Sequence, residues 1–156
     1  MIYYIIPLIL FAFFNVNNSI DNCIPKPYLF STETFQSNMD MFQILTEINS
    51  LLPQLSDFVN QFNNLVITSK ISVITDSTGN MSIDVPQDMS DSVANNLSTR
   101  IGVIDRLITT RGQEINDLFQ KGLEIENNIK KDNPNYTSQL TEKIAEFKRL
   151  NSSYKH

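Results

Sequence analysis

The chain of 156 residues is poor in the residue types that most often carry out chemistry, with one cysteine, one histidine and four glycines. The histidine is His156, at the end of the sequence, and the cysteine is Cys23. Catalysis by a Cys–His pair or a Ser–His–Asp triad needs an oriented imidazole, and zinc sites are built chiefly from cysteine and histidine. The sequence therefore predicts no enzyme, no metal site and no cofactor. The few glycines form no phosphate-binding loop.

The single cysteine also limits how the fold is stabilised. An internal disulfide is impossible, so packing alone must hold the domain together, unlike in small cysteine-rich toxins and growth factors. A lone thiol can still join two chains. A dimer linked through Cys23 of each copy therefore stays open.

Basic residues are outnumbered by acidic ones, and the formal net charge is −5. An acidic chain is a poor partner for nucleic acid or for an anionic membrane surface. The charge is unevenly spread, since residues 20–99 hold nine acidic and two basic residues, whereas residues 100–156 hold eight acidic and ten basic residues. The two halves are electrostatically complementary, and no nucleic acid is expected as a partner.

Residues 2–14 form the one long apolar run of the sequence. This run matches the hydrophobic region of a secretory signal peptide and falls short of the roughly 20 residues that a membrane-spanning helix needs. The sequence predicts a signal peptide over residues 1–19, with cleavage before Ile20, and hence a secreted protein. The alternatives are an uncleaved anchor, a buried N-terminal segment, and an intracellular protein whose translation begins at Met39.

An extended leader is predicted over residues 20–33, and a helix over residues 34–67, where apolar residues recur at every third or fourth position. The stripe comprises Phe35, Met39, Phe42, Leu45, Ile48, Leu52, Leu55, Val59, Phe62 and Val66. Pro53 should kink or split this helix. Its phenylalanines, including Phe58, would either pack in the core or line a lipid cavity, and core packing is the preferred interpretation.

A β-hairpin is predicted over residues 69–86, because the apolar period changes to two on both sides of a turn at residues 76–80. A second helix is expected from about Ser90, with an apolar stripe that repeats every seven residues, as in coiled coils. That stripe comprises Val93, Leu97, Ile101, Ile104, Ile108, Arg111, Ile115, Leu118, Gly122, Ile125 and Ile129. A third helix is predicted with Asn133 as its cap and Pro134 as its first residue.

The turn position also predicts how the two long helices face each other. If the hairpin is centred at Thr78, residues whose numbers sum to about 156 lie opposite one another. Gly102 would then lie beside Pro53 and permit close approach of the helices. Arg111 would form an interhelical ion pair with Glu47, because a guanidinium in a seam is costly unless it is paired.

The predicted fold class is mainly α, a long antiparallel, coiled-coil-like helical hairpin joined by a β-hairpin, plus a third shorter helix, in a single domain over residues 34–156. For such a fold without catalytic residues we predict a secreted binding protein. The expected partner is another protein or a second copy bound through helix faces, or else a lipid held between the helices. The alternative is an intracellular coiled-coil subunit of a multiprotein complex.

Overall fold

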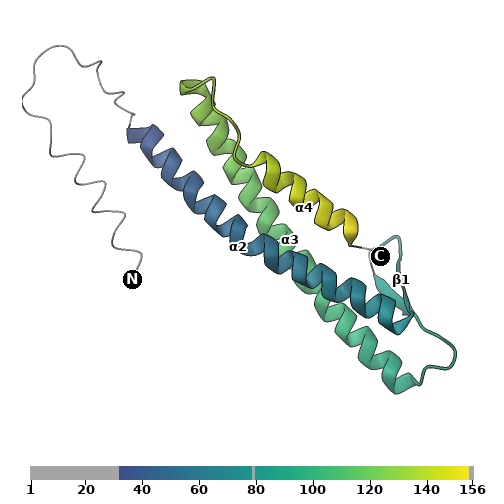
Figure 1. Cartoon of the computed structure of the whole chain (residues 1–156). Coiled ribbons are helices and arrows are strands. Elements are labelled where there is room, and N and C mark those ends of the chain that lie inside the picture. The colour runs from purple at the N-terminus through teal and green to yellow at the C-terminus, as the bar shows by residue number, and fades with distance from the viewer. Residues whose placement is uncertain (1–31, 79, 155–156) are drawn as a thin grey trace, which may run out of the picture. The chain divides into compact units, whose positions relative to one another are not determined.

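The computed structural model describes residues 32–78 and 80–154, which belong to one compact unit (Figure 1). The elements are α2 (Thr32–Ser69), β1 (Ser72–Thr75), β2 (Met81–Asp84), α3 (Asp91–Asp132) and α4 (Thr141–Ser153). The mainly helical fold class is thereby confirmed. The predicted signal peptide and leader up to residue 31, with Cys23, and the terminal His156 lie outside the described residues.

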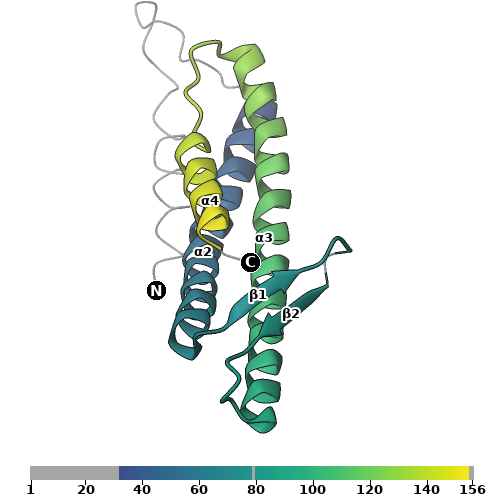
Figure 2. The same cartoon turned by 90° about the vertical axis from the view of Figure 1, so that its right-hand side faces the viewer.

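The core is the seam between α2 and α3, which run antiparallel beside each other (Figures 1 and 2). Residues spaced by three and four return to the same face of a helix, so each helix turns one apolar stripe to the other. The buried members are Met41, Ile44, Ile48, Leu52, Leu55, Val59 and Phe62 on α2, and Leu97, Ile101, Ile108, Ile115 and Ile129 on α3. None of the described helices has a segment long and apolar enough to cross a bilayer.

α4 folds back and covers one side of this seam (Figure 2). The ring of Phe147 packs against Phe119 of α3, with centroids 5.6 Å apart. The ring of Tyr154, which follows α4, lies edge-on to Phe62 of α2 at 4.7 Å. Because α4 widens the core on this side, Phe119 is buried although it lies outside the predicted stripe.

The hydroxyl of Tyr154 donates a hydrogen bond to Asp105 of α3. Burial, followed by this hydrogen bond and the charge of Asp105, raises the pKa of the tyrosine above its usual 10. An unfolded tyrosine ionises near pH 10. The unfolded state is therefore favoured as the pH rises past 10.

We expect Tyr154→Phe to lower the free energy of unfolding at pH 7 by about 1 kcal/mol, because a hydrogen bond to a charged acceptor is lost from a partly exposed site. The variant should also lose less stability than the wild type between pH 7 and pH 10.5. Urea unfolding of both proteins at the two pH values measures this difference. Equal losses would show that Tyr154 does not couple folding to alkaline pH.

The predicted start of the third helix is wrong. Asn133 ends α3 instead, and its backbone N–H bonds the carbonyl of Ile129 at 2.9 Å. Residues 133–140 form a connection that lets the chain reverse, and α4 begins only at Thr141. The connection seats Leu140, which is fully buried, against Gly122.

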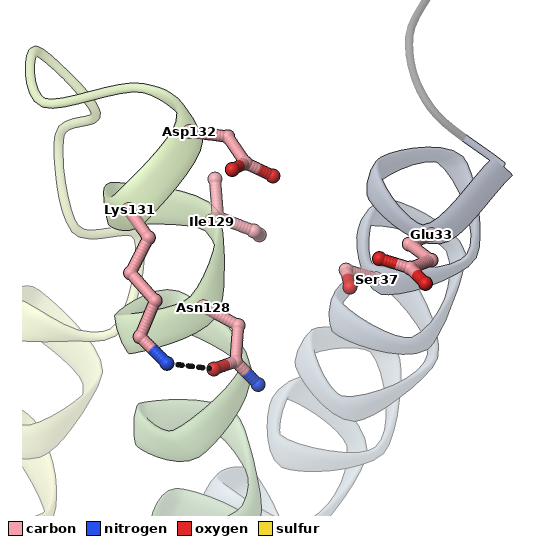
Figure 3. A pocket seen from close by; sticks show the side chains of 6 residues that line it. All are labelled: Glu33, Ser37, Asn128, Ile129, Lys131 and Asp132. Atoms are coloured by element: carbon pink, nitrogen blue, oxygen red, sulfur yellow. Dashed lines mark hydrogen bonds between the residues drawn. The ribbon is translucent and has the colours of Figure 1, made fainter.

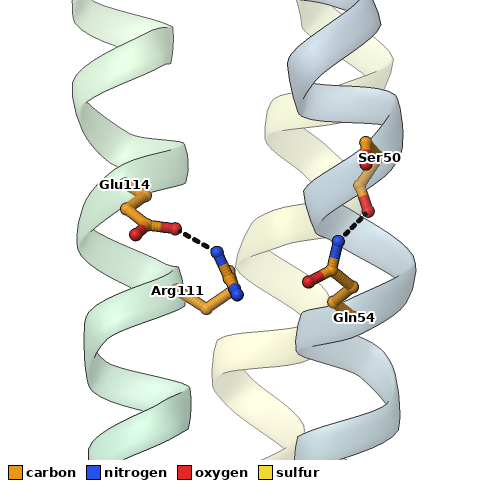
Figure 4. Close-up of polar contacts among 4 residues, drawn as sticks. All are labelled: Ser50, Gln54, Arg111 and Glu114. Carbon is orange, nitrogen blue, oxygen red and sulfur yellow. Dashed lines mark hydrogen bonds and ion pairs between the residues drawn. The ribbon is translucent and has the colours of Figure 1, made fainter.

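Of the two predicted effects of Pro53, a kink or a split, the split is not observed, since α2 continues through the proline as one helix. Proline leaves the carbonyl four residues earlier without its helical partner. That residue, Asn49, is exposed to solvent, so water can bond its carbonyl. Beside the proline, the side-chain amide of Gln54 donates to the carbonyl of Ser50 at 3.0 Å (Figure 4).

The β-hairpin has the predicted register. Ser72 pairs with Asp84 and Thr75 with Met81, so the paired residue numbers sum to 156. In the turn, the carboxylate of Asp76 accepts the backbone N–H of Thr78 and of Asn80, at 2.8 and 2.9 Å. The Thr78 hydroxyl and these amides lower the pKa of Asp76 from 3.8 to about 2. A local network of this kind sets the turn without help from the helices.

The two long helices do not follow the hairpin register. Gly122 lies against Ile44, and these residue numbers sum to 166 rather than 156. Two residues connect α2 to β1, whereas six connect β2 to α3. The longer connection lets α3 begin beyond the end of α2 (Figure 1), so α3 is displaced along α2.

Both contacts inferred from the predicted register are therefore wrong. A Cβ at Gly102 would meet no atom within 4 Å, so this glycine marks no close approach. Arg111 pairs with Glu114 of its own helix at 2.6 Å (Figure 4), and Glu47 accepts a hydrogen bond from Gln43. The Arg111 side chain is 29% exposed, so it reaches solvent and needs no partner on α2.

Candidate functional site

Polar clusters in the described part of the chain offer little chemistry. Within residues 32–78 and 80–154, no group of three or more His, Cys, Asp or Glu side chains is placed to hold a metal ion. The buried charged residue is Glu126, only 1% exposed, whose Oε1 accepts the backbone N–H of Gln139 at 2.8 Å. Burial and this carboxylate raise the pKa of the nearby Tyr136. This cluster lies in the interior and fastens the connection between α3 and α4.

An open cavity of about 300 Å³ lies between the first turn of α2 and the last turn of α3 (Figure 3). It is lined by Glu33, Ser37, Asn128, Ile129, Lys131 and Asp132. The ammonium of Lys131 donates to the side chain of Asn128 at 3.0 Å. Ile129 is the one apolar side chain in this lining, so the cavity lacks the apolar walls that a lipid site needs.

The phenylalanines of α2 do not gather around a common space. Phe62 is 0% exposed and lies in the core, whereas Phe42 is 66% exposed on the surface. Between five and six turns of helix separate these two residues. A ligand cavity that they both line is therefore not present.

A cluster of large apolar side chains is exposed on the first turns of α2. Phe35 and Met39 are each 50% exposed and Phe42 is 66% exposed. Their spacing of four and then three residues makes them neighbours on one side of the helix. We call these three residues the α2 face. Core packing, the preferred interpretation of the predicted stripe, is therefore wrong for all three residues.

The error arose because the first half of α2 carries two apolar stripes. One stripe is the α2 face. The other begins with Met41, which precedes Phe42, and continues with Ile44, which follows it. A helix can turn only one of these stripes to α3. Ile44 meets Gly122, where the partner helix has no side chain, so the second stripe is buried and the first is left outward. The presence of two stripes was the sequence signal that one of them must face away from α3, although the spacing does not say which one.

A row of acidic side chains runs along α2 on one side of the α2 face, beyond two glutamines. Glu33, Asp40 and Glu47 are spaced seven residues apart, which puts them in one row along the helix. Two glutamine side chains between this row and the α2 face hydrogen-bond to it, Gln36 to Asp40 at 2.7 Å and Gln43 to Glu47 at 3.1 Å. The 38 residues of α2 include no lysine or arginine. This helix therefore presents an apolar centre beside a negatively charged edge.

Although the two halves of the chain have complementary charges, no ion pair joins α2 to α3 among residues 32–78 and 80–154. The ion pairs Arg111–Glu114 and Lys143–Glu146 each link residues of a single helix. Asp40 and Glu47 bond to glutamines of α2 itself. The acidic edge of α2 is therefore available to a partner.

No family model, no curated protein and no solved structure matches this chain. The function must be argued from the geometry and charge of the described residues.

Proposed function

We propose that the protein is a secreted, non-catalytic binding protein that contacts another protein through the α2 face. The observation that carries this proposal is the exposure of Phe35, Met39 and Phe42 on a helix whose other stripe already fills the core. Contiguous exposed apolar side chains on soluble proteins commonly mark interaction sites. Aromatic residues and methionine are also enriched where protein surfaces meet.

A protein partner explains this surface better than a carried lipid or a membrane surface does. The side chains of the α2 face are exposed rather than arranged around a cavity, as a carried lipid would require. The acidic row beside them would be repelled by an anionic membrane. A protein surface can cover the apolar centre and place cations at its edge.

Export is the second part of the proposal, and the apolar run over residues 2–14 supports it. The alternative, an intracellular coiled-coil subunit, has translation starting at Met39. α2 begins at Thr32, so a start at Met39 would remove its first seven residues, with Glu33 and Phe35. N-terminal sequencing of the native protein should find Ile20 as the first residue. A first residue of Met39 would reject export.

Photocrosslinking tests the binding face. A photoreactive residue at position 42 should form a covalent adduct with a protein in an extract of the source organism. The same residue at position 60 is the matched control, because Asn60 is exposed and lies five whole helical turns along the same side of α2. It should form no such adduct.

The adduct at position 42 should also disappear when Phe35 and Met39 are both replaced by serine, because these neighbours complete the apolar surface. Far-UV circular dichroism checks that each variant is folded. Equal adducts at positions 42 and 60, or an adduct that survives the two serines, would contradict binding through the α2 face.

A further inference from the structure

A second exposed apolar surface lies on α3. Val93 is 49%, Val103 52% and Leu107 39% exposed. Val93, Arg100 and Leu107 are spaced seven residues apart, and Val103 falls between the last two at helical spacing. We call Val93, Arg100, Val103 and Leu107 the α3 face.

Arginines mark this surface, as carboxylates mark the α2 face. Arg100 lies within the α3 face, and Arg106 lies beside it, three residues after Val103. Both arginines are exposed, and neither pairs with an acidic side chain among residues 32–78 and 80–154. The nearest acid in sequence, Asp105, is bonded to Tyr154 on the side covered by α4. The α3 face therefore combines exposed apolar side chains with one arginine among them and a second arginine at its edge.

The two faces have complementary chemistry but cannot meet within one molecule. Ile44 lies against Gly122, so the α2 face is level with the part of α3 just beyond Gly122. At 1.5 Å per residue, that part of α3 lies roughly 30 to 40 Å from Val103. The two faces are thus at opposite ends of the helical hairpin (Figure 1).

We infer that the α3 face of one copy of this protein docks on the α2 face of a second copy. This inference rests on the proposed function, because it names a second copy as the protein that covers the α2 face. Apolar side chains would form the centre of the contact. The side chains of Arg100 and Arg106 would extend from the contact toward the row of Glu33, Asp40 and Glu47, as charge complementarity between surfaces favours.

The same charges disfavour an antiparallel contact of the α2 face with itself. In an antiparallel two-fold pairing of helices, each flank meets the same flank of the copy, so the acidic rows would be juxtaposed and repel. Contact between unlike faces leaves one face free at each end of the dimer. Copies therefore add head to tail, into open chains or a closed ring.

Two variants and their mixture test this arrangement. The first, Phe35→Ser with Phe42→Ser, disables the α2 face, and the second, Val103→Ser with Leu107→Ser, disables the α3 face. Sedimentation velocity under reducing conditions, which exclude a link through Cys23, should show wild-type assemblies that grow with concentration. Each variant alone should be monomeric. An equimolar mixture should form a one-to-one dimer, because each variant retains the face that the other lacks.

Ile67→Ser with Ile74→Ser is the matched control, since both side chains are more than half exposed and lie outside the two faces. This control should assemble as the wild type does. Raising the salt concentration from 0.05 to 0.5 M should weaken wild-type assembly several-fold, because exposed ion pairs are screened. Circular dichroism confirms that every variant is folded.

A wild type that stays monomeric at all concentrations, a mixture that does not dimerise, or assembly that strengthens with salt would each overturn the inference. An α3-face variant that assembles as well as the wild type would show that the α3 face is not part of the contact, and would reject the inference. If position 42 crosslinks to a different protein while the wild type is monomeric, the proposed function stands and only the second copy as partner is rejected.

Discussion

Replacing Gly122 by leucine should lower the free energy of unfolding by about 1 to 3 kcal/mol, the usual cost of overpacking a filled core. A Cβ at this position would lie 2.7 Å from Cδ1 of Leu140 and 3.4 Å from Cγ2 of Ile44. Leu140 is 0% exposed, so its methyl group cannot move into solvent. Denaturant unfolding followed by circular dichroism measures the change.

Gly102→Leu is the matched control on the same helix. A Cβ there meets no atom within 4 Å, and leucine is a better helix former than glycine by roughly 0.8 kcal/mol. The control should therefore be as stable as the wild type or slightly more stable. Equal effects of the two substitutions would show that Leu140 is not seated on Gly122.

Replacing Phe62 by alanine should cost about 3 to 5 kcal/mol of the free energy of unfolding, the range for phenylalanine truncated in a core. The side chain is fully buried and packs edge-on against the ring of Tyr154 at 4.7 Å. Its loss would leave a cavity where α2 meets the end of α4. Thermal and denaturant unfolding give the change in stability.

Phe42→Ala makes the same chemical change on the surface of the same helix. Because this side chain is 66% exposed, the free energy of unfolding should change by less than about 0.5 kcal/mol. Association with a partner should weaken instead. A large loss of stability in Phe42→Ala would contradict the outward position of the α2 face.

Much of the local structure is present in the sequence. The change of apolar period from three and four to two, and back, locates α2, the hairpin and α3, because each period reflects the geometry of one element. The hairpin register is also local, since the Asp76 carboxylate bonds the backbone of its own turn. Ser90 precedes α3 as expected, and Asn133 marks a helix boundary, but it ends α3 rather than beginning the third helix.

The candidate binding face was not predictable from apolar spacing alone. Phe35, Met39 and Phe42 have the same period as Met41, Ile44 and Ile48, and periodicity cannot say which stripe turns to the partner helix. Burying the second stripe depends on Gly122, a residue nearly 80 positions away in sequence, whose missing side chain admits Ile44 and Leu140. Because the second stripe is buried against α3, the stripe of Phe35, Met39 and Phe42 is left exposed.

By itself, the sequence determined which segments are helix and strand, the reversal of the chain at Thr78 and the segregation of negative charge on α2, because these depend on neighbouring residues. Only the tertiary structure decided how far α3 slides along α2, which glycine is packed, and that Arg111 pairs with Glu114 rather than Glu47. It also decided that the α2 face lies outward. These features depend on contacts between residues far apart in the chain. The two connections around the hairpin differ in length, so they allow several registers of α3 along α2. Only the packing of the whole helices distinguishes these registers.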